Sequence, residues 1–135
     1  MASPMGERLV MTTPTSPIFV IEGFDVSIYA SVEDAERHLE SPDILDNRYV
    51  AYDSEGRLLI LKAPRPKTRK FFGIQSVTVD KINISCDESQ PLHSEALKKE
   101  LKELLKHFGV SPAWLEKAPL KDLVTKSIEQ VGFTK

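Results

Sequence analysis

The stretch RYVAYDSEGRLLILK, residues 48–62, decides the fold that this sequence predicts. Two apolar runs, YVAY and LLIL, flank the polar segment Asp53-Ser54-Glu55-Gly56. Aspartate favours the first position of a type I turn, and glycine can adopt the positive φ that closes a bulged hairpin loop. We therefore expect a β-hairpin in the middle of an antiparallel sheet, with the rest of the chain packed around it.

Two β-prone segments precede this hairpin. They are IFVI at residues 18–21 and VSIYA at residues 26–30, and the EGFD segment between them has turn character. Either a second hairpin or a single bulged strand fits this pattern. We favour the hairpin.

A short helix is predicted to begin after Ser31. The Ser31 hydroxyl can cap a free amide, and Glu33 and Asp34 lie at the positive end of the helix dipole. Ser41-Pro42 is expected to end the helix. One face of the helix is apolar, with Val32, Ala35 and Leu39.

The second half of the chain changes from strand to helix. Residues 63–70 contain two prolines and several cations, which indicates an exposed loop, and residues 71–86 are predicted to form strand with a change of register near Asp80-Lys81. Two apolar stripes at helical spacing follow, formed by Leu97, Leu101, Leu104, Leu105 and Phe108 and by Leu120, Leu123, Val124, Ile128 and Val131. We predict an α+β fold: an antiparallel β-sheet with hairpins, one short helix in the N-terminal half and C-terminal helices packed on one face.

Length and composition suit a single domain. The chain has 135 residues, 41% of them apolar, which is enough for one core. Residues 1–17 contain three prolines and no apolar periodicity, so we expect a disordered leader and place the domain at residues 18–135. One cysteine, no signal peptide and no long apolar run predict a soluble protein of the reducing cytoplasm.

No catalytic or metal site assembles in the sequence. His38, His93 and His107 are too scattered for a zinc site, and Cys86 stands beside two acids, which disfavour an activated thiolate. We therefore expect no catalytic residue, no metal and no cofactor. A small hydrolase built from scattered carboxylates or histidines is our last hypothesis.

Charge is distributed unevenly along the chain. Residues 18–61 carry ten acids and three bases, a net charge of −7, whereas residues 62–135 carry nine acids and fourteen bases, a net charge of +5. The predicted partner-binding carboxylates are Glu33, Glu36, Glu40, Asp43, Asp46, Asp53 and Glu55. Such a cluster can attract a cationic protein, although solubility alone also explains an acidic surface.

A nucleic-acid site is the alternative. The basic residues that would contact phosphates are Lys62, Arg65, Lys67, Arg69 and Lys70, followed by two phenylalanines. An ordinary solvated loop explains the same residues.

Several segments resemble a family of small bacterial proteins. They are SVEDAERHLE at residues 31–40, PDILDN at 42–47, YVAYDSEGRLL at 49–59 and PLHSEALKKELKELLKHFG at 91–109. Proteins of this kind are associated with polymorphic-toxin and contact-dependent inhibition loci. The resemblance implies an immunity protein, a non-catalytic protein-binding module that neutralises a cognate bacterial toxin by occluding its active site.

Overall fold

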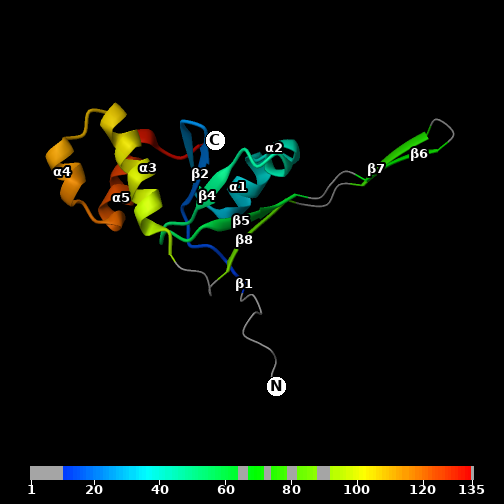
Figure 1. Ribbon diagram of the computed structural model, residues 1–135, viewed down its shortest axis with the longest axis horizontal. Helices are drawn as coiled ribbons and strands as arrows, with labels where there is room; N and C mark the ends of the chain where they lie inside the picture. Colours follow the sequence, from blue (N-terminus) through cyan, green and yellow to red (C-terminus); the bar gives the residue numbers. More distant parts are fainter. Residues whose placement is uncertain (1–10, 64–66, 72–73, 79–81, 88–91, 135) are drawn as a thin grey trace, which may run out of the picture.

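The computed structural model describes residues 11–63, 67–71, 74–78, 82–87 and 92–134. Its elements (Figure 1) are β1 (Met11–Thr12), β2 (Ile18–Glu22), β3 (Asp25–Tyr29), α1 (Val32–His38), α2 (Ser41–Leu45), β4 (Val50–Tyr52), β5 (Leu59–Lys62), β6 (Lys67–Phe71), β7 (Ile74–Thr78), β8 (Asn83–Asp87), α3 (Ser94–His107), α4 (Pro112–Lys117) and α5 (Leu120–Val131). The predicted α+β class is confirmed.

The strands form antiparallel sheets in the orders β3-β2-β4, β1-β8-β5 and β6-β7. The predicted hairpin of residues 18–30 is confirmed as β2 and β3, joined at Gly23 with a φ of 63°. The hairpin of residues 48–62 differs from the prediction. Its turn forms, but β4 pairs with β2 and β5 pairs with β8, and a single bridge joins Tyr52 to Leu58.

The sheet of β2, β3 and β4 is covered on both faces. On β2, Ile18 and Val20 belong to one core, and Phe19 and Ile21 belong to the other, because successive side chains of a strand point to opposite faces. The first core also contains buried residues of α1 and α2, and the second contains those of α3, α4 and α5. Figure 1 shows these two groups of helices on either side of the strands.

The N-terminal half contains two short helices rather than one. The Ser31 side chain caps α1 as predicted, accepting a hydrogen bond from the Asp34 amide at 3.1 Å. Ser41-Pro42 follows the end of α1 but opens α2, since proline is tolerated in a first helical turn. Ile44 of α2 is buried in the first core, so packing stabilises this short helix.

The N-terminal boundary lies earlier than predicted. Residues 11–17 belong to the fold: β1 pairs with β8, matching Thr12 with Cys86, and Pro14 is buried. The first ten residues of the predicted leader lie outside the described residues. Pairing with the distant strand β8 holds this short segment, which has few apolar residues. No local sequence pattern predicts this pairing.

The single strand region predicted for residues 71–86 is divided among three strands, β6, β7 and β8. Residues 67–70 of the predicted loop belong to β6, which pairs with β7, and β8 belongs to another sheet. The proposed register change at Asp80-Lys81 lies outside the described residues. The C-terminal stripes are confirmed in α3 and α5 by five buried residues, Leu97, Leu101, Leu105, Leu123 and Val124. Phe108 and Val131, at the ends of the two stripes, are exposed.

Candidate functional site

The Tyr49 hydroxyl lies among carboxylates from separate parts of the sequence. It donates a hydrogen bond to Asp43 Oδ2 at 3.2 Å. Burial raises the pKa of Tyr49, and the negative charges of Asp43 and Glu22 raise it further, whereas a hydrogen bond with the Glu40 backbone lowers it. Glu22 ends β2 and Asp43 lies in α2, so the fold brings both carboxylates close enough to act on one phenol.

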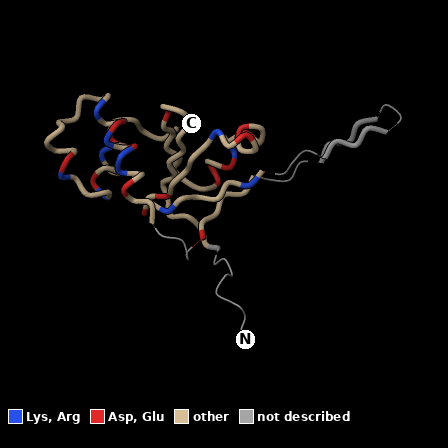
Figure 2. Tube along the Cα trace, in the orientation of Figure 1, with Lys and Arg blue, Asp and Glu red and all other residues tan. Residues whose placement is uncertain are grey.

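We define the acidic surface as Glu22, Glu40, Asp43 and Asp46. Glu22 and Asp43 act on the Tyr49 phenol, Glu40 contacts it through its backbone, and Asp46 joins them through Arg48. Among the described residues, Arg48 pairs with this surface: Nε lies 3.7 Å from Asp43 Oδ1 and 3.8 Å from Asp46 Oδ2. The Arg48 side chain is 60% exposed, so water screens both pairs. Figure 2 shows several acidic positions along α1 and α2. The surface therefore keeps a net negative charge.

The predicted carboxylates do not all belong to this surface. Glu33 is exposed on α1. Glu36 turns inward, and its Oε2 accepts a hydrogen bond from the Ile84 amide of β8 at 2.9 Å. Because β1 pairs with β8 only at residues 86 and 87, Glu36 satisfies an amide that no strand covers. It joins α1 to the sheet and is not a free docking group.

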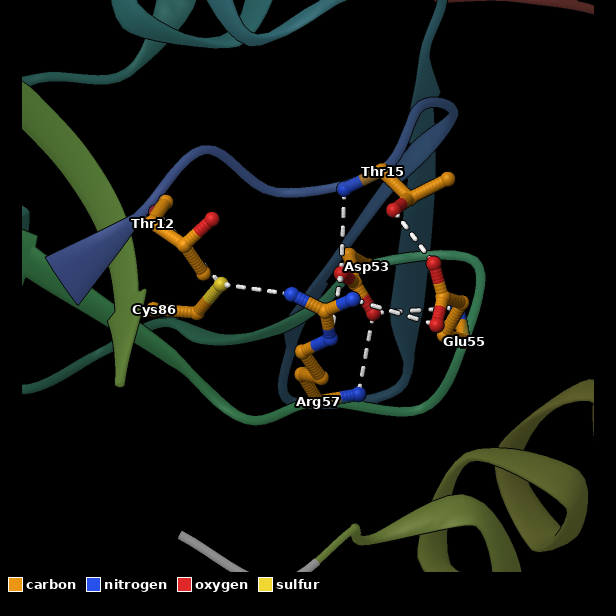
Figure 3. Close-up of polar contacts among 6 residues, drawn as sticks. All are labelled: Thr12, Thr15, Asp53, Glu55, Arg57 and Cys86. Atoms are coloured by element: carbon orange, nitrogen blue, oxygen red, sulfur yellow. Dashed lines mark hydrogen bonds and ion pairs between the residues drawn. The ribbon is translucent and has the colours of Figure 1, made fainter. Parts of the chain in front are cut away.

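The prediction that Asp53 faces a partner is wrong. Asp53 has no exposed surface. Its Oδ1 accepts hydrogen bonds from the amides of Glu55 and Arg57 at 3.0 and 2.9 Å, and its Oδ2 accepts one from the Thr15 amide at 3.0 Å (Figure 3). Asp53 thus fixes the turn between β4 and β5 and holds the segment that leads from β1 to β2.

Glu55 is also engaged within this turn. Its carboxylate accepts hydrogen bonds from the Thr15 hydroxyl and from Arg57 Nη2, and these raise the stability of the charged form (Figure 3). The Thr15 hydrogen bond, followed by that of Arg57, lowers the pKa of Glu55 below its usual value. Its side chain is 49% exposed. Glu55 therefore contributes at most a partly neutralised charge to a docking surface.

Cys86 does not form a nucleophilic site. It is fully buried in the first core, as expected for a small apolar residue at a strand end. Its sulfur donates to the Thr12 carbonyl at 3.5 Å, and Arg57 Nη1 lies at the same distance. Contact with Cys86, followed by that with Glu55, raises the pKa of Arg57 above its usual range, so the guanidinium stays charged. No substrate can reach this thiol in the observed packing.

The predicted basic residues are divided between elements. Lys62 is exposed at the end of β5, whereas Lys67, Arg69 and Lys70 belong to β6, so they lie on a strand rather than in a loop. Arg65 lies outside the described residues. Lys62 is the only basic residue of β5, and β8, which pairs with β5, contains none.

A lysine-lined groove of about 440 Å³ separates α3 from α4. Four lysines of α3 line it, but so do Glu95, Glu103 and Glu116, and Lys98 Nζ lies 3.2 Å from Glu95 Oε2. The carboxylates offset most of the positive charge. This groove therefore gives no support to a phosphate-binding site.

The sequence did not predict a cleft around the edge of β3, with a volume of about 560 Å³. We call it the edge cleft. Glu22, Phe24 and Asp25 line it at the tip of the β2–β3 hairpin; Val26, Leu104, Phe108 and Val131 line it on the side of the second core, and Tyr29, Leu39 and Tyr49 line it on the side of the first. Glu22 belongs to both the cleft and the acidic surface, and Tyr49 of the cleft donates a hydrogen bond to Asp43, so the two are continuous.

Comparison with family models, curated proteins and solved structures gave no match. The resemblance to immunity proteins therefore remains a prediction. Within the described ranges, no group of three or more acidic, histidine or cysteine side chains is arranged to hold a metal ion. Over the same ranges, every helix is too short or too polar to cross a bilayer.

Proposed function

We propose that this chain is a non-catalytic protein-binding module that docks a basic partner on its acidic surface. The specific form that we propose is an immunity protein that occludes the active site of a cognate toxin. The observation that carries the proposal is the meeting of carboxylates from separate segments around Tyr49: its hydroxyl donates to Asp43 Oδ2 at 3.2 Å, and Tyr49 lines one cleft with Glu22. Arg48 lies between Asp43 and Asp46 on the same surface.

The proposed mechanism of docking is electrostatic attraction. A toxin that acts on nucleic acid or on another anion presents a basic cleft, and an opposing acidic surface accelerates encounter and fixes orientation. Occlusion requires no chemical reaction catalysed by this chain. It needs carboxylates held on a firm support, and α2 provides one because Ile44 anchors it in the first core beside β5.

The described contacts narrow the predicted binding set. Glu33, Glu40, Asp43 and Asp46 remain candidates, and Glu22 joins them through Tyr49. Asp53 is removed because it is buried, and Glu36 and Glu55 are occupied by contacts within the fold.

The proposal predicts that a toxin gene neighbours this one, and the test is capture of the toxin domain that such a gene encodes. In the first variant Asp43→Lys and Asp46→Lys reverse the acidic surface, and in the matched control Glu103→Lys and Glu116→Lys make the same change of net charge on α3 and α4, where both residues are exposed. Affinity is measured by calorimetry at two ionic strengths.

We expect the first variant to lose at least about tenfold in affinity and much of its salt dependence, because each reversal replaces attraction with repulsion. The control should stay within about threefold, the range expected for a change in long-range field alone. Equal losses in both variants would show that net charge, and not this surface, governs binding. Unchanged capture by the first variant would refute the proposal.

A further inference from the structure

β3 is the edge strand of its sheet, and its outward backbone groups can be identified. On one side β3 pairs with β2, matching Ile28 with Phe19 and Val26 with Ile21. On the other side the Ile28 amide donates to Thr134 Oγ1 at 3.0 Å, and the Thr134 amide donates to the Ile28 carbonyl at 2.6 Å. The amide and carbonyl of Ile28 therefore both point away from β2.

Val26 shares this outward direction. In an antiparallel pair, residues two apart along a strand direct their N–H and C=O groups to the same side. No described residue forms a hydrogen bond with the outward groups of Val26. Thr134 shows that this edge accepts an extended backbone, and no residue in the described part of the chain pairs with the tip half of β3.

The edge cleft surrounds this open half on both faces of the sheet. Leu104 and Phe108 line it on the face of the second core, and Tyr29 and Tyr49 line it on the face of the first. Side chains of an extended segment alternate between the two faces of a sheet. A strand added beside Val26 would direct its apolar side chains into one half of the cleft and the alternating side chains into the other, which is how strand addition gains specificity.

Charge identifies the kind of segment that fits. Glu22 and Asp25 line the cleft at the hairpin tip, and the acidic surface continues from Tyr49. Phe24 beside them is fully exposed, at 105%. A segment with lysine or arginine beside its apolar residues is attracted here. A second copy of β3 is disfavoured because pairing at Val26 would bring two copies of Asp25 close together.

We infer that the open edge of β3 binds an extended, cationic segment of the partner protein by strand addition. This inference rests on the proposed function and adds its binding mode: the carboxylates attract the partner, and the Val26 backbone and the edge cleft hold one of its segments. The recognised chemistry is a β-prone peptide in which apolar residues alternate with lysine.

The experiment uses a synthetic peptide of sequence KVTVKVTK with blocked ends and the full chain. Three peptides are compared: the parent, one in which glutamate replaces each lysine, and one N-methylated at alternate residues so that its amides cannot pair with a strand. Titration followed by NMR gives affinity, and amide hydrogen exchange of Val26 reports pairing at the edge. Exchange at Lys117, which ends α4 on the far side of α3, is the internal control.

We expect the parent peptide to slow exchange of the Val26 amide by about tenfold or more and to leave the Lys117 amide unchanged. The glutamate and N-methylated peptides should bind at least about tenfold more weakly, since they lack the charge and the donors respectively. Val26→Pro removes the outward N–H and should weaken the parent peptide about tenfold, whereas Val26→Thr should stay within about twofold. If Val26→Pro does not fold, the N-methylated peptide tests the same hydrogen bonds.

Several results would overturn the inference. They are equal binding of the N-methylated peptide, unaltered Val26 exchange in the bound state, and absence of binding at about millimolar peptide. Protection of Val26 that grows with protein concentration alone would identify a second copy as the occupant. Loss of toxin capture on reversing Asp43 and Asp46, combined with unprotected Val26 in the complex, would keep the proposed function and refute strand addition.

Discussion

Replacing Asp53 with alanine should destabilise the protein more than any exposed acidic substitution. The buried carboxylate accepts three backbone hydrogen bonds, from Thr15, Glu55 and Arg57, and its Oδ2 lies 3.6 Å from Arg57 Nε. A hydrogen bond to a charged group contributes about 1.5 kcal/mol or more. Water can reach part of the turn once the side chain is removed, so we expect a loss of about 3 kcal/mol.

Urea unfolding followed by circular dichroism measures this loss. With a slope of about 1.5 kcal/mol per molar, typical of small proteins, the midpoint should fall by about 2 M. Glu33→Ala is the matched control, since this carboxylate is exposed on α1, and it should change stability by less than about 0.5 kcal/mol. A second readout is hydrogen exchange at the Thr15 amide, which loses its acceptor and should exchange faster.

The reasoning fails if Asp53→Ala and Glu33→Ala have the same midpoint within error. It also fails if Asp53→Ala loses about 3 kcal/mol without faster exchange at Thr15, because the cost would then arise elsewhere than at the contact between the turn and the N-terminal segment.

Three further predictions concern local features. Gly56→Ala should lower the melting temperature more than Gly109→Ala. Both glycines have positive φ, 86° and 80°, but a Cβ at Gly56 would lie 2.7 Å from the backbone of the first residue of α3, whereas one at Gly109 meets nothing within 4 Å. Equal losses in the two variants would show that the contact at Gly56 has no energetic cost. Ser31→Ala should lower the free energy of unfolding by about 1 kcal/mol, measured by chemical denaturation, because it removes the α1 cap, and Ser31→Asp should retain most of the wild-type stability. An unchanged stability of Ser31→Ala would show that the cap does not stabilise the protein. The folded-state pKa of Glu55 is lowered, first by the Thr15 hydrogen bond, so its ionised form adds stability above the unfolded-state pKa and this contribution disappears as pH falls through the folded-state pKa. The stability difference between wild type and Glu55→Gln should therefore shrink between about pH 5 and pH 3, and a difference independent of pH would contradict the assignment.

Local chemistry explains the parts of the fold that the sequence predicted. The Ser31 cap, the turn at Gly23 and the leucine stripe of α3 depend on residues within a few positions of one another. Such short-range signals are complete in the sequence itself. The run IFVI on β2 contains a further local signal, because four consecutive apolar residues are typical of a strand covered on both faces, and all four are buried.

The candidate sites depended on contacts that no local pattern contains. Sequence reasoning placed Asp53 with the surface acids, yet three amides and Arg57 enclose it in a buried turn. The edge cleft was not predicted because the hairpin tip, α3 and α5 meet there from distant parts of the chain.

The sequence by itself therefore determined the α+β class, the Ser31 cap of α1 and the uneven distribution of charge, and it favoured the first hairpin. Only the tertiary structure decided that β4 and β5 enter different sheets, that Glu22 and Asp43 share a surface and that the tip of β3 stays open. The reason is physical: caps and stripes arise from neighbours along the chain, whereas burial of a carboxylate or exposure of a strand edge depends on which distant segments pack beside it.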